Sequence, residues 1–147
     1  AIHIYNLVKR SQQDHVIAHG SGIASAFCDT ANQLLNHEGA IGINARLDEE
    51  PQQVFERLVR YIKNHQITDD ILLLVDMGSL TTFAGELEKL FPLKAKSIPL
   101  VSTMHVLEAS RKAMIGCGLR EVYVETLKVN DYMAIYQDRK EVEQLQI

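Results

Sequence analysis

Residues Ile71–Val75 form a run of five apolar residues that no polar residue interrupts, and few kinds of sheet accept such a strand. A strand with one solvated face alternates apolar and polar residues, whereas a parallel strand covered by helices on both faces is apolar throughout. Further short, mainly apolar segments at residues 15–18, 40–44 and 97–101 are separated by longer stretches with apolar residues at helical spacing. The alternation predicts an α/β fold, with residues 71–75 in the middle of a parallel sheet.

The stretches between the strands predict how the sheet is covered. We expect a doubly wound, mainly parallel four-stranded sheet with strand order 2-1-3-4 and helices on both faces. The predicted helices span residues 23–35, 51–62, 82–90 and 103–115. Alternating residues at 121–125 predict an extra C-terminal edge strand. In the first and last helices, the residues expected to face the sheet are Ile23, Phe27, Ala31, Leu34 and Leu35, and Val106, Leu107, Ala113 and Met114.

The length of 147 residues suits one domain. We expect an N-terminal extension at residues 1–13, a folded domain at 14–126, and a C-terminal extension or linker at 127–147. The net charge of −4 disfavours direct nucleic-acid binding by this domain, because such binding relies on clustered cations. No apolar run approaches the roughly 18 residues of a membrane span, and no secretory signal opens the chain, so we expect a cytoplasmic location.

Two polar residues follow strands at the edge of the sheet where ligands bind. In an open α/β sheet a ligand lies beyond the carboxyl ends of the strands, where the strand order reverses. With the order 2-1-3-4 this point lies between the first and third strands, which are followed by His19 and Asp76. The sequence therefore predicts that His19 and Asp76 meet in one crevice.

These residue types predict phosphoryl chemistry. A neutral imidazole is a nucleophile near pH 7, and a carboxylate that accepts a hydrogen bond from one ring nitrogen leaves the other nitrogen free to attack. We therefore assign catalytic roles to His19 and Asp76. Amides at a helix N-terminus favour a phosphoryl group, and this chemistry requires no metal or other cofactor. The expected phosphate-binding residues are Gly20, Ser21, Gly22, Gly78, Ser79 and Thr81, with Thr82 as a further hydroxyl donor.

Other interpretations stay open at the level of sequence. A lone histidine in an α/β protein is often structural, and an aspartate after a strand often caps a helix. His15 and His19 lie four residues apart on an extended segment without a third ligand, which disfavours zinc. His105 either reaches the crevice or has a surface or capping role. The histidines expected to be exposed are His3, His37 and His65.

A nucleotide site is a further alternative. Residues 20–25 imitate a dinucleotide-binding fingerprint, but the second strand closes with Asn44, Ala45 and Arg46 instead of an acidic residue for the ribose. Nucleotide binding is therefore disfavoured.

Several segments resemble one protein family. They are residues 18–20 (Ala-His-Gly), 31–35 (Ala-Asn-Gln-Leu-Leu), 73–81 (Leu-Leu-Val-Asp-Met-Gly-Ser-Leu-Thr), 101–103 (Val-Ser-Thr) and 106–113 (Val-Leu-Glu-Ala-Ser-Arg-Lys-Ala). Together they resemble the mannose-type EIIA domain of the bacterial phosphotransferase system, as embedded in LevR-type sigma-54-dependent transcriptional regulators. The block at residues 75–81 is similar to the regulator branch, because transporter domains usually carry a Trp-Gly-Gly-Ser-Pro type segment there.

The resemblance implies that His19 is phosphorylated, that Asp76 orients it, and that HPr or another phosphotransferase protein is the donor. Three functions follow as alternatives. We favour a regulatory phosphoacceptor domain that tunes a sigma-54-dependent activator. The others are a free transporter subunit that passes phosphate to IIB, and an interaction or dimerisation module that is not phosphorylated.

Two features depart from the family pattern. The family usually has Pro after the Val-Ser-Thr triplet, where this chain has Met104 and His105, and the first strand is expected to be shorter than usual. Transporter domains of the family form homodimers by exchanging a C-terminal strand, and residues 121–125 are a candidate for such a strand here.

Overall fold

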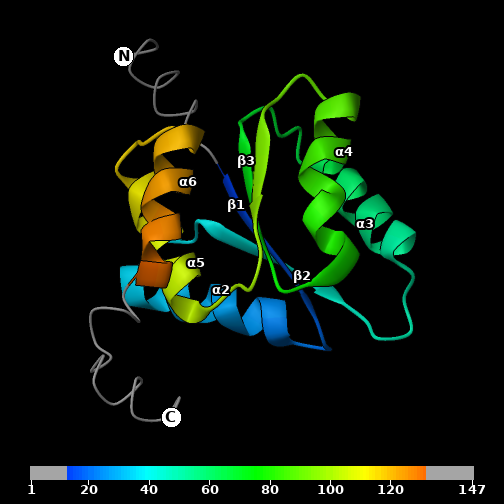
Figure 1. Cartoon of the computed structure of the whole chain (residues 1–147), viewed down its shortest axis with the longest axis horizontal. Coiled ribbons are helices and arrows are strands. Elements are labelled where there is room, and N and C mark those ends of the chain that lie inside the picture. Colours follow the sequence, from blue (N-terminus) through cyan, green and yellow to red (C-terminus); the bar gives the residue numbers. More distant parts are fainter. Residues whose placement is uncertain (1–12, 132–147) are drawn as a thin grey trace, which may run out of the picture.

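Four parallel strands form one sheet in the order β2-β1-β3-β4, and helices pack on both of its faces (Figure 1). The computed structural model describes residues 13–131. This is the doubly wound α/β fold that the sequence predicts, with the predicted strand order. Along the chain the elements are β1 (Gln13–His19), α2 (Ile23–Leu35), β2 (Ala40–Ala45), α3 (Pro51–Asn64), β3 (Ile71–Val75), the 3-10 helix η1 (Gly78–Thr82), α4 (Phe83–Leu90), β4 (Ala95–Ile98), α5 (Thr103–Met114), α6 (Leu119–Leu127) and the 3-10 helix η2 (Lys128–Asp131).

The apolar strand β3 lies in the interior of the sheet, as predicted. Val75 pairs with Ile17 of β1, and Leu74 pairs with Ile98 of β4. All five β3 side chains are buried. Its alternate residues point to opposite faces of the sheet, so both faces of β3 need apolar side chains.

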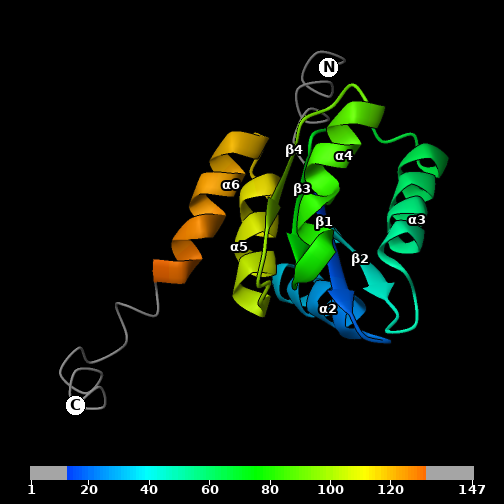
Figure 2. The same ribbon diagram turned by 45° about the vertical axis from the view of Figure 1, so that its right-hand side comes forward.

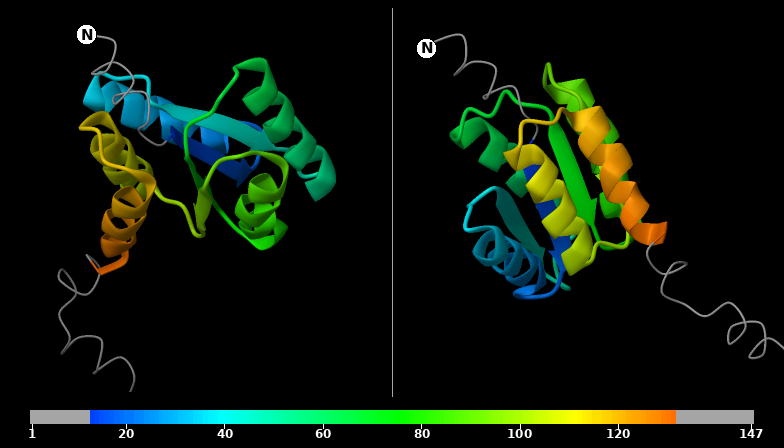
Figure 3. Two further views of the ribbon diagram at one scale, coloured as in Figure 1. Left: turned by 90° about the horizontal axis from the view of Figure 1, so that it is seen from above. Right: turned by 90° about the vertical axis from the view of Figure 1, so that its left-hand side faces the viewer.

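Two apolar cores flank the sheet. One lies under α3, η1 and α4 and contains Leu73 and Leu87, and the other lies under α2, α5 and α6 and contains Leu72 and Val106. Figure 3 shows the sheet between the two helix layers in its left panel, and α2, α5 and α6 side by side over one face in its right panel. In Figure 2, α6 is the outermost helix of this layer, against α5.

Ala31 is buried as predicted, but in the first half of α2 the face turned to the sheet differs from the prediction by one position. The buried residues are Ala24, Cys28 and Ala31, whereas Ile23 is exposed and so is Leu34. The cause lies in β2, where a Cβ atom added at Gly42 would lie 2.9 Å from the backbone of Ala24. Because helix and strand approach this closely, only small side chains fit between them.

Residues 121–125, predicted as an edge strand, lie in α6. Leu119, Val122 and Thr126 recur at helical spacing, and all three are buried. Five alternating residues are too few to separate a period of 2 from a period of 3.6. The candidate segment for strand exchange between two copies is therefore helical.

The fourth strand also lies earlier than predicted, at Ala95–Ile98 instead of 97–101. After Ile98 the backbone leaves the sheet, since Leu100 has a φ of 58° and donates its N–H to the carbonyl oxygen of Asp76 at 3.0 Å. The apolar residues Leu100 and Val101 thus belong to the loop after β4 and not to the strand.

Two helix predictions need smaller corrections. The helix predicted at 82–90 begins at Phe83, because residues 78–82 form the 3-10 turn η1 instead. At the end of α5, Met114 is 48% exposed, since the buried face of this helix passes through Val106, Ala109 and Ser110.

Among residues 13–131, no helix combines the length and the apolar character that a membrane crossing requires.

The N-terminal extension predicted at 1–13 lies outside the described residues except for Gln13, which begins β1. Of the extension predicted at 127–147, Lys128–Asp131 form η2, in which Val129 is buried. β1 has seven residues, so the first strand is not the short segment that the sequence suggests.

Candidate functional site

His19 and Asp76 meet at the carboxyl edge of the sheet. His19 ends β1 and Asp76 follows β3, and these two strands are neighbours. Nδ1 of His19 lies 2.9 Å from Oδ1 and 3.0 Å from Oδ2 of Asp76. The backbone N–H of His19 donates to Oδ2 at 2.8 Å. The two residues expected to converge are therefore in direct contact.

This contact determines which nitrogen of His19 is available. An ionised carboxylate only accepts hydrogen bonds, so Nδ1 carries the proton and Nε2 keeps its lone pair. The carboxylate is held in turn by the backbone N–H of Met77, which donates to Oδ1 at 2.8 Å. The side chains of His19 and Asp76 are 28% and 26% exposed, so the pair is partly shielded but reachable from solvent. This geometry suits Nε2 to act as a nucleophile.

The turn after His19 leads directly into α2. Gly20 has a φ of 124°, which other residues rarely adopt, and a Cβ atom there would lie 2.7 Å from Cγ1 of Ile23. The N–H of Gly20 donates to the carbonyl oxygen of Ala45 at 2.8 Å, so this amide is occupied. The helix begins at Ile23, and the positive end of its dipole favours a negatively charged group beside His19.

Asn44 of β2 stabilises the start of α2. Its Oδ1 accepts the N–H of Ser25 at 3.1 Å, and its Nδ2 donates to Oγ of Ser25 at 2.8 Å. The first N–H groups of a helix have no partner within the helix, and the N-cap residue of α2 is Gly22, which has no side chain to offer. Asn44 thus supplies, from a neighbouring strand, the cap that the sequence of α2 lacks.

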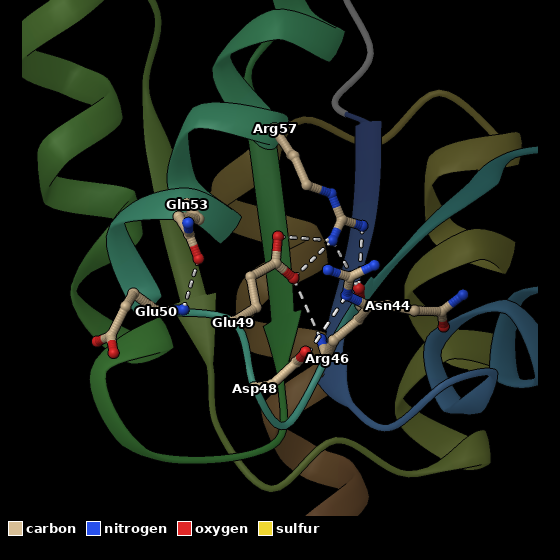
Figure 4. A network of polar contacts seen from close by, with 7 residues as sticks. All are labelled: Asn44, Arg46, Asp48, Glu49, Glu50, Gln53 and Arg57. Atoms are coloured by element: carbon tan, nitrogen blue, oxygen red, sulfur yellow. Dashed lines mark hydrogen bonds and ion pairs between the residues drawn. The ribbon is translucent and has the colours of Figure 1, made fainter.

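Arg57 of α3 fastens the end of β2 to the loop that follows it (Figure 4). Both terminal nitrogens of the guanidinium donate to the carbonyl oxygen of Asn44 at 2.9 Å, and Nη1 also donates to Oε1 of Glu49 at 2.7 Å. Burial raises the pKa of Glu49, but hydrogen bonds from Arg57 and from the backbone N–H of Arg46 outweigh it and leave the pKa below its ordinary value. Together with Ser21, these residues line an open hollow of about 400 Å³.

The loop after Asp76 is built as a compact 3-10 turn. Gly78 opens it with a φ of 69°. Oγ1 of Thr81 donates to the carbonyl oxygen of Gly78, and Oγ1 of Thr82 donates to that of Ser79, both at 2.8 Å. The hydroxyl protons of Thr81 and Thr82 therefore already have acceptors, whereas Ser79 and Ser21 are exposed.

His105 caps α5 instead of joining the pair. Its Nδ1 accepts the N–H of Ser102 at 3.1 Å, so its Nε2 carries the proton, and Nε2 lies 2.8 Å from Oδ1 of Asn130. This is the capping role that the sequence allowed. The contact with Asn130 connects the first turn of α5 to η2.

His15 is fully buried beneath α3, with its ring edge-on to Tyr61 at 5.8 Å between centroids. Neither ring nitrogen has a hydrogen-bond partner in the described chain, and burial lowers the pKa of His15 to about 4. It lies four residue steps along β1 from His19, a distance of about 13 Å. Within residues 13–131, no group of His, Cys, Asp and Glu side chains is arranged to hold a metal ion. His37 and His65 are exposed as predicted, and His3 lies outside the described residues.

The sequence indicates neither the role of Asn44 nor that of Arg57. Gly42 in β2 is a weak signal that a helix packs closely against this strand, but it does not show that Asn44 bonds to that helix. Arg57 gives no signal, because an arginine on a helix surface usually faces solvent. Its partners come from β2 and the following loop, and only the folded chain brings them together.

Comparison with known proteins identifies the class to which this fold belongs, the IIA components of the phosphotransferase system. The family described as "EIIA-man: PTS system fructose IIA component" matches residues 16–115, and the chain belongs to it.

Among its relatives are two transcriptional regulatory proteins. The chain is 28% identical to LevR of Bacillus subtilis over 139 residues, which cover 92% of this chain and 15% of LevR. It is 29% identical to DagR of Salmonella typhimurium over 93 residues, which cover 63% of this chain and 10% of DagR. The chain thus spans a small part of the length of both relatives.

The solved structures with the same fold include a sigma-54 interaction domain protein and a IIA subunit of the phosphotransferase system. A sigma-54 interaction domain protein from Enterococcus faecalis superposes with a TM-score of 0.83 and 32% identity, covering 89% of this chain and 98% of that chain. The mannose/sorbose-specific IIA subunit of the phosphotransferase system from Enterococcus faecalis gives 0.71 and 13% identity, covering 87% and 96%. The second comparison shows a shared fold alone.

Proposed function

We propose that this domain accepts a phosphoryl group on Nε2 of His19 from a phosphotransferase-system protein such as HPr. We further propose that its phosphorylation state tunes a sigma-54-dependent transcriptional activator. The observation that carries the first statement is the contact of Nδ1 of His19 with both carboxylate oxygens of Asp76, at 2.9 and 3.0 Å. This contact keeps the Nε2 lone pair available and fixes the direction in which the ring points.

The transfer balances without an external acid or base. Nε2 of His19 attacks the phosphorus of a phosphohistidine on the donor, a new N–P bond forms, and the donor's N–P bond breaks. The electron pair of the broken bond returns to the donor imidazole. The proton on Nδ1 of His19 stays in its hydrogen bond to Asp76, whose negative charge stabilises the ring as it gains positive character during the attack.

The start of α2 would hold the transferred group. Its dipole favours an anion, and Ser21 and Gly22 lie between His19 and the first helical residue. The N–H of Gly20 already donates to the carbonyl oxygen of Ala45. We therefore assign Gly20 a role in shaping the turn. Across the crevice, we assign Gly78 and Ser79 supporting contacts to the phosphoryl oxygens, whereas Thr81, whose hydroxyl donates to the carbonyl oxygen of Gly78, supports the turn that carries them.

The relatives favour a regulatory output. The similarity to LevR extends over 92% of this chain, and the sigma-54 interaction domain protein is 32% identical, whereas the mannose/sorbose IIA subunit shares the fold at 13% identity. A regulator needs a phosphoryl group that persists as a signal. A transporter subunit must pass it on to IIB.

Labelling with phosphoenolpyruvate, enzyme I and HPr tests the acceptor role. We expect the wild-type protein to gain one phosphoryl group and His19→Ala to gain none. His37→Ala and His65→Ala are matched controls, because both histidines are exposed and lie away from the pair, and both variants should label like the wild type. Undiminished labelling of His19→Ala would refute the assignment.

A second assay separates the regulator from the transporter subunit. Phosphorylated protein, freed of donor, is mixed with IIB components of mannose-family transporters. We expect the label to stay on His19 under these conditions. Rapid passage of the label to IIB would identify a transporter subunit. In cells, His19→Ala should change transcription from the cognate sigma-54-dependent promoter, and equal transcription with both proteins would contradict the regulatory role.

A further inference from the structure

The hollow of about 400 Å³ at the end of β2 carries more positive than negative charge, and we call it the arginine hollow. Its lining comes from the loop after β1, from β2 and the loop after it, and from α3. The lining residues are Ser21, Asn44, Arg46, Glu49 and Arg57. Two guanidinium groups are thus opposed by a single carboxylate, and such a surface favours an anion.

The backbone brings Arg46 close to His19. His19 is the register partner of Ala45, the residue before Arg46, and adjacent strands lie about 4.8 Å apart. Beyond the strands the two segments stay together, because the N–H of Gly20 donates to the carbonyl oxygen of Ala45 at 2.8 Å. With the strand order β2-β1-β3, His19 has Asp76 on one side and Arg46 on the other.

His19 also faces the side of the sheet on which the hollow is built. Ile17 and Ala45 belong to the apolar core under α3, and alternate residues of a strand share a face. His19, two positions after Ile17, therefore faces the α3 layer. Arg57 extends from α3 to the end of β2 in that same layer (Figure 4).

The two arginines differ in how firmly they are held. Arg57 donates to the carbonyl oxygen of Asn44 from both terminal nitrogens and also to Glu49, and its side chain is 33% exposed. The side chain of Arg46 is 70% exposed, and its Nε lies 3.5 Å from Oδ1 of Asp48, which is 80% exposed. An ion pair this exposed contributes little, so Arg46 can exchange Asp48 for a more strongly charged anion.

Arg46 also supplies the positive charge that is in excess near His19. Glu49 neutralises Arg57, to which it is bonded at 2.7 Å. Among the described loops at the carboxyl edge, those after β1, β3 and β4 contain no Lys or Arg. A phosphoryl group carries about two negative charges and three acceptor oxygens, and the planar guanidinium of an arginine binds such oxygens in pairs.

We propose that Arg46 binds the phosphoryl group on Nε2 of His19, exchanging its contact with Asp48 for the phosphoryl oxygens. This inference rests on the proposed function and adds a cationic side chain to the start of α2 as a holder of the transferred group. Arg57 and Glu49 are positioning residues, because Arg57 holds the end of β2 and Glu49 accepts the backbone N–H of Arg46 at 3.2 Å. The guanidinium keeps its protons throughout, so the balance of the transfer is unchanged.

The equilibrium constant for phosphoryl transfer from HPr to the domain tests this role, because an equilibrium constant does not depend on how the two proteins dock. The reaction is started from either phosphorylated protein, and the phosphorylated fraction of each is measured at the end. For Arg46→Gln we expect a constant about five- to tenfold below that of the wild type, through loss of a charge-assisted contact. For Asp48→Asn, which removes the competing anion, we expect a constant about two- to fourfold above it.

Arg111→Gln and Glu108→Gln are the matched controls. These two residues form an exposed ion pair of 3.2 Å on α5, far along the helix from its start at the carboxyl edge. Both variants should keep the wild-type equilibrium constant within about 1.5-fold. Unphosphorylated Arg46→Gln and Asp48→Asn should melt within about 1 °C of the wild type, because the pair that they break is exposed.

The phosphoryl group itself reports the contact. A nearby cation favours its fully ionised form, so a phosphorus NMR titration of the phosphorylated domain should give a higher pKa for the phosphoryl group in Arg46→Gln than in the wild type. Arg111→Gln should titrate like the wild type. A purely structural role of Arg46 would leave this pKa unchanged.

The outcomes separate this inference from the proposed function. If the wild type gains no phosphoryl group on His19, the proposed function itself is wrong. If the wild type is labelled there and Arg46→Gln keeps the wild-type equilibrium constant, the binding role of Arg46 alone is wrong, and a slower rate with that same constant would make Arg46 a contact for the donor. A constant in Asp48→Asn at or below that of the wild type would overturn the exchange of partners.

Discussion

Asn44 and Ser25 exchange two hydrogen bonds, one from the Ser25 N–H to Oδ1 of Asn44 and one from Nδ2 of Asn44 to Oγ of Ser25, at 3.1 and 2.8 Å. The pair connects the end of β2 to the first turn of α2, the helix on whose dipole the proposed phosphoryl site depends. The stability of that helix end is therefore decided by a residue from another element.

Substituting Asn44 tests this dependence. Asn44→Ala removes the cap and should cost about 1 kcal/mol, which lowers the melting temperature by about 2–4 °C. Asn44→Asp keeps an acceptor for the Ser25 N–H but adds a negative charge at the helix end, so its HPr-dependent labelling should be about two- to fivefold slower. Asn32→Asp is the matched control, because Asn32 accepts the N–H groups of Gly39 and Ala40 at the far end of the same helix. Equal labelling rates for Asn44→Asp and Asn32→Asp would show that α2 does not hold the phosphoryl group.

Asp76→Asn should slow phosphorylation strongly without unfolding the domain. An amide can accept through oxygen or donate through nitrogen, so it no longer imposes a proton on Nδ1 of His19. We expect the initial rate of labelling to fall on the order of 10²–10⁴-fold, the range seen when a group that orients a catalytic histidine is lost. Asp70→Asn provides the comparison, since Asp70 accepts the N–H of Lys94 at the opposite edge of the sheet. A wild-type rate in Asp76→Asn would remove Asp76 from the mechanism.

Stability should decline with acid because of His15. Burial lowers the pKa of His15 to about 4 in the folded protein, whereas an unfolded histidine has a pKa near 6.5. Between these values the unfolded chain binds a proton that the folded chain does not, so the free energy of unfolding falls as the pH drops through this window, by up to about 3 kcal/mol. Urea titrations near pH 7 and pH 4.5 measure the change.

The variant His15→Leu isolates this contribution. Its side chain cannot titrate, so the difference between the two pH values should shrink by most of that amount, and the acid loss that remains belongs to carboxylates. An identical pH dependence in the wild type and His15→Leu would mean that the pKa of His15 is the same in the folded and the unfolded chain, so that burial does not lower it.

Gly42→Ala should destabilise the domain and slow phosphorylation together. The added Cβ atom would lie 2.9 Å from backbone atoms of Ala24, and backbone cannot step aside as a flexible side chain can. We expect a loss of about 1–3 kcal/mol by urea titration, accompanied by slower labelling of His19 because the first turn of α2 is displaced. Gly85→Ala, in an exposed position of α4 with open space around it, should instead stabilise by about 0.5–1 kcal/mol. Equal stabilities of the two variants would contradict the close approach of α2 and β2.

The sequence predicts the sheet and the meeting of His19 with Asp76 for one physical reason. The apolar run of β3 requires cover on both faces, and the order of parallel strands then places the residues after β1 and β3 side by side. These inferences depend on backbone topology alone. Features that depend on how side chains from different elements pack were missed, including the contacts of Arg57 and the burial of Ala24 instead of Ile23. The helix α6 was misassigned because a five-residue alternation fits two periods equally well.

The distribution of ionised groups around His19 matters for how its state is sensed. The loops after β1, β3 and β4 bear no formal charge apart from Asp76, and Arg46, Glu49 and Arg57 line the hollow beside Ser21, so a phosphoryl group of about two negative charges would strongly change the local field. The contrast between the two states is then large for a single modification. A neighbouring module with cationic side chains would detect one state and ignore the other.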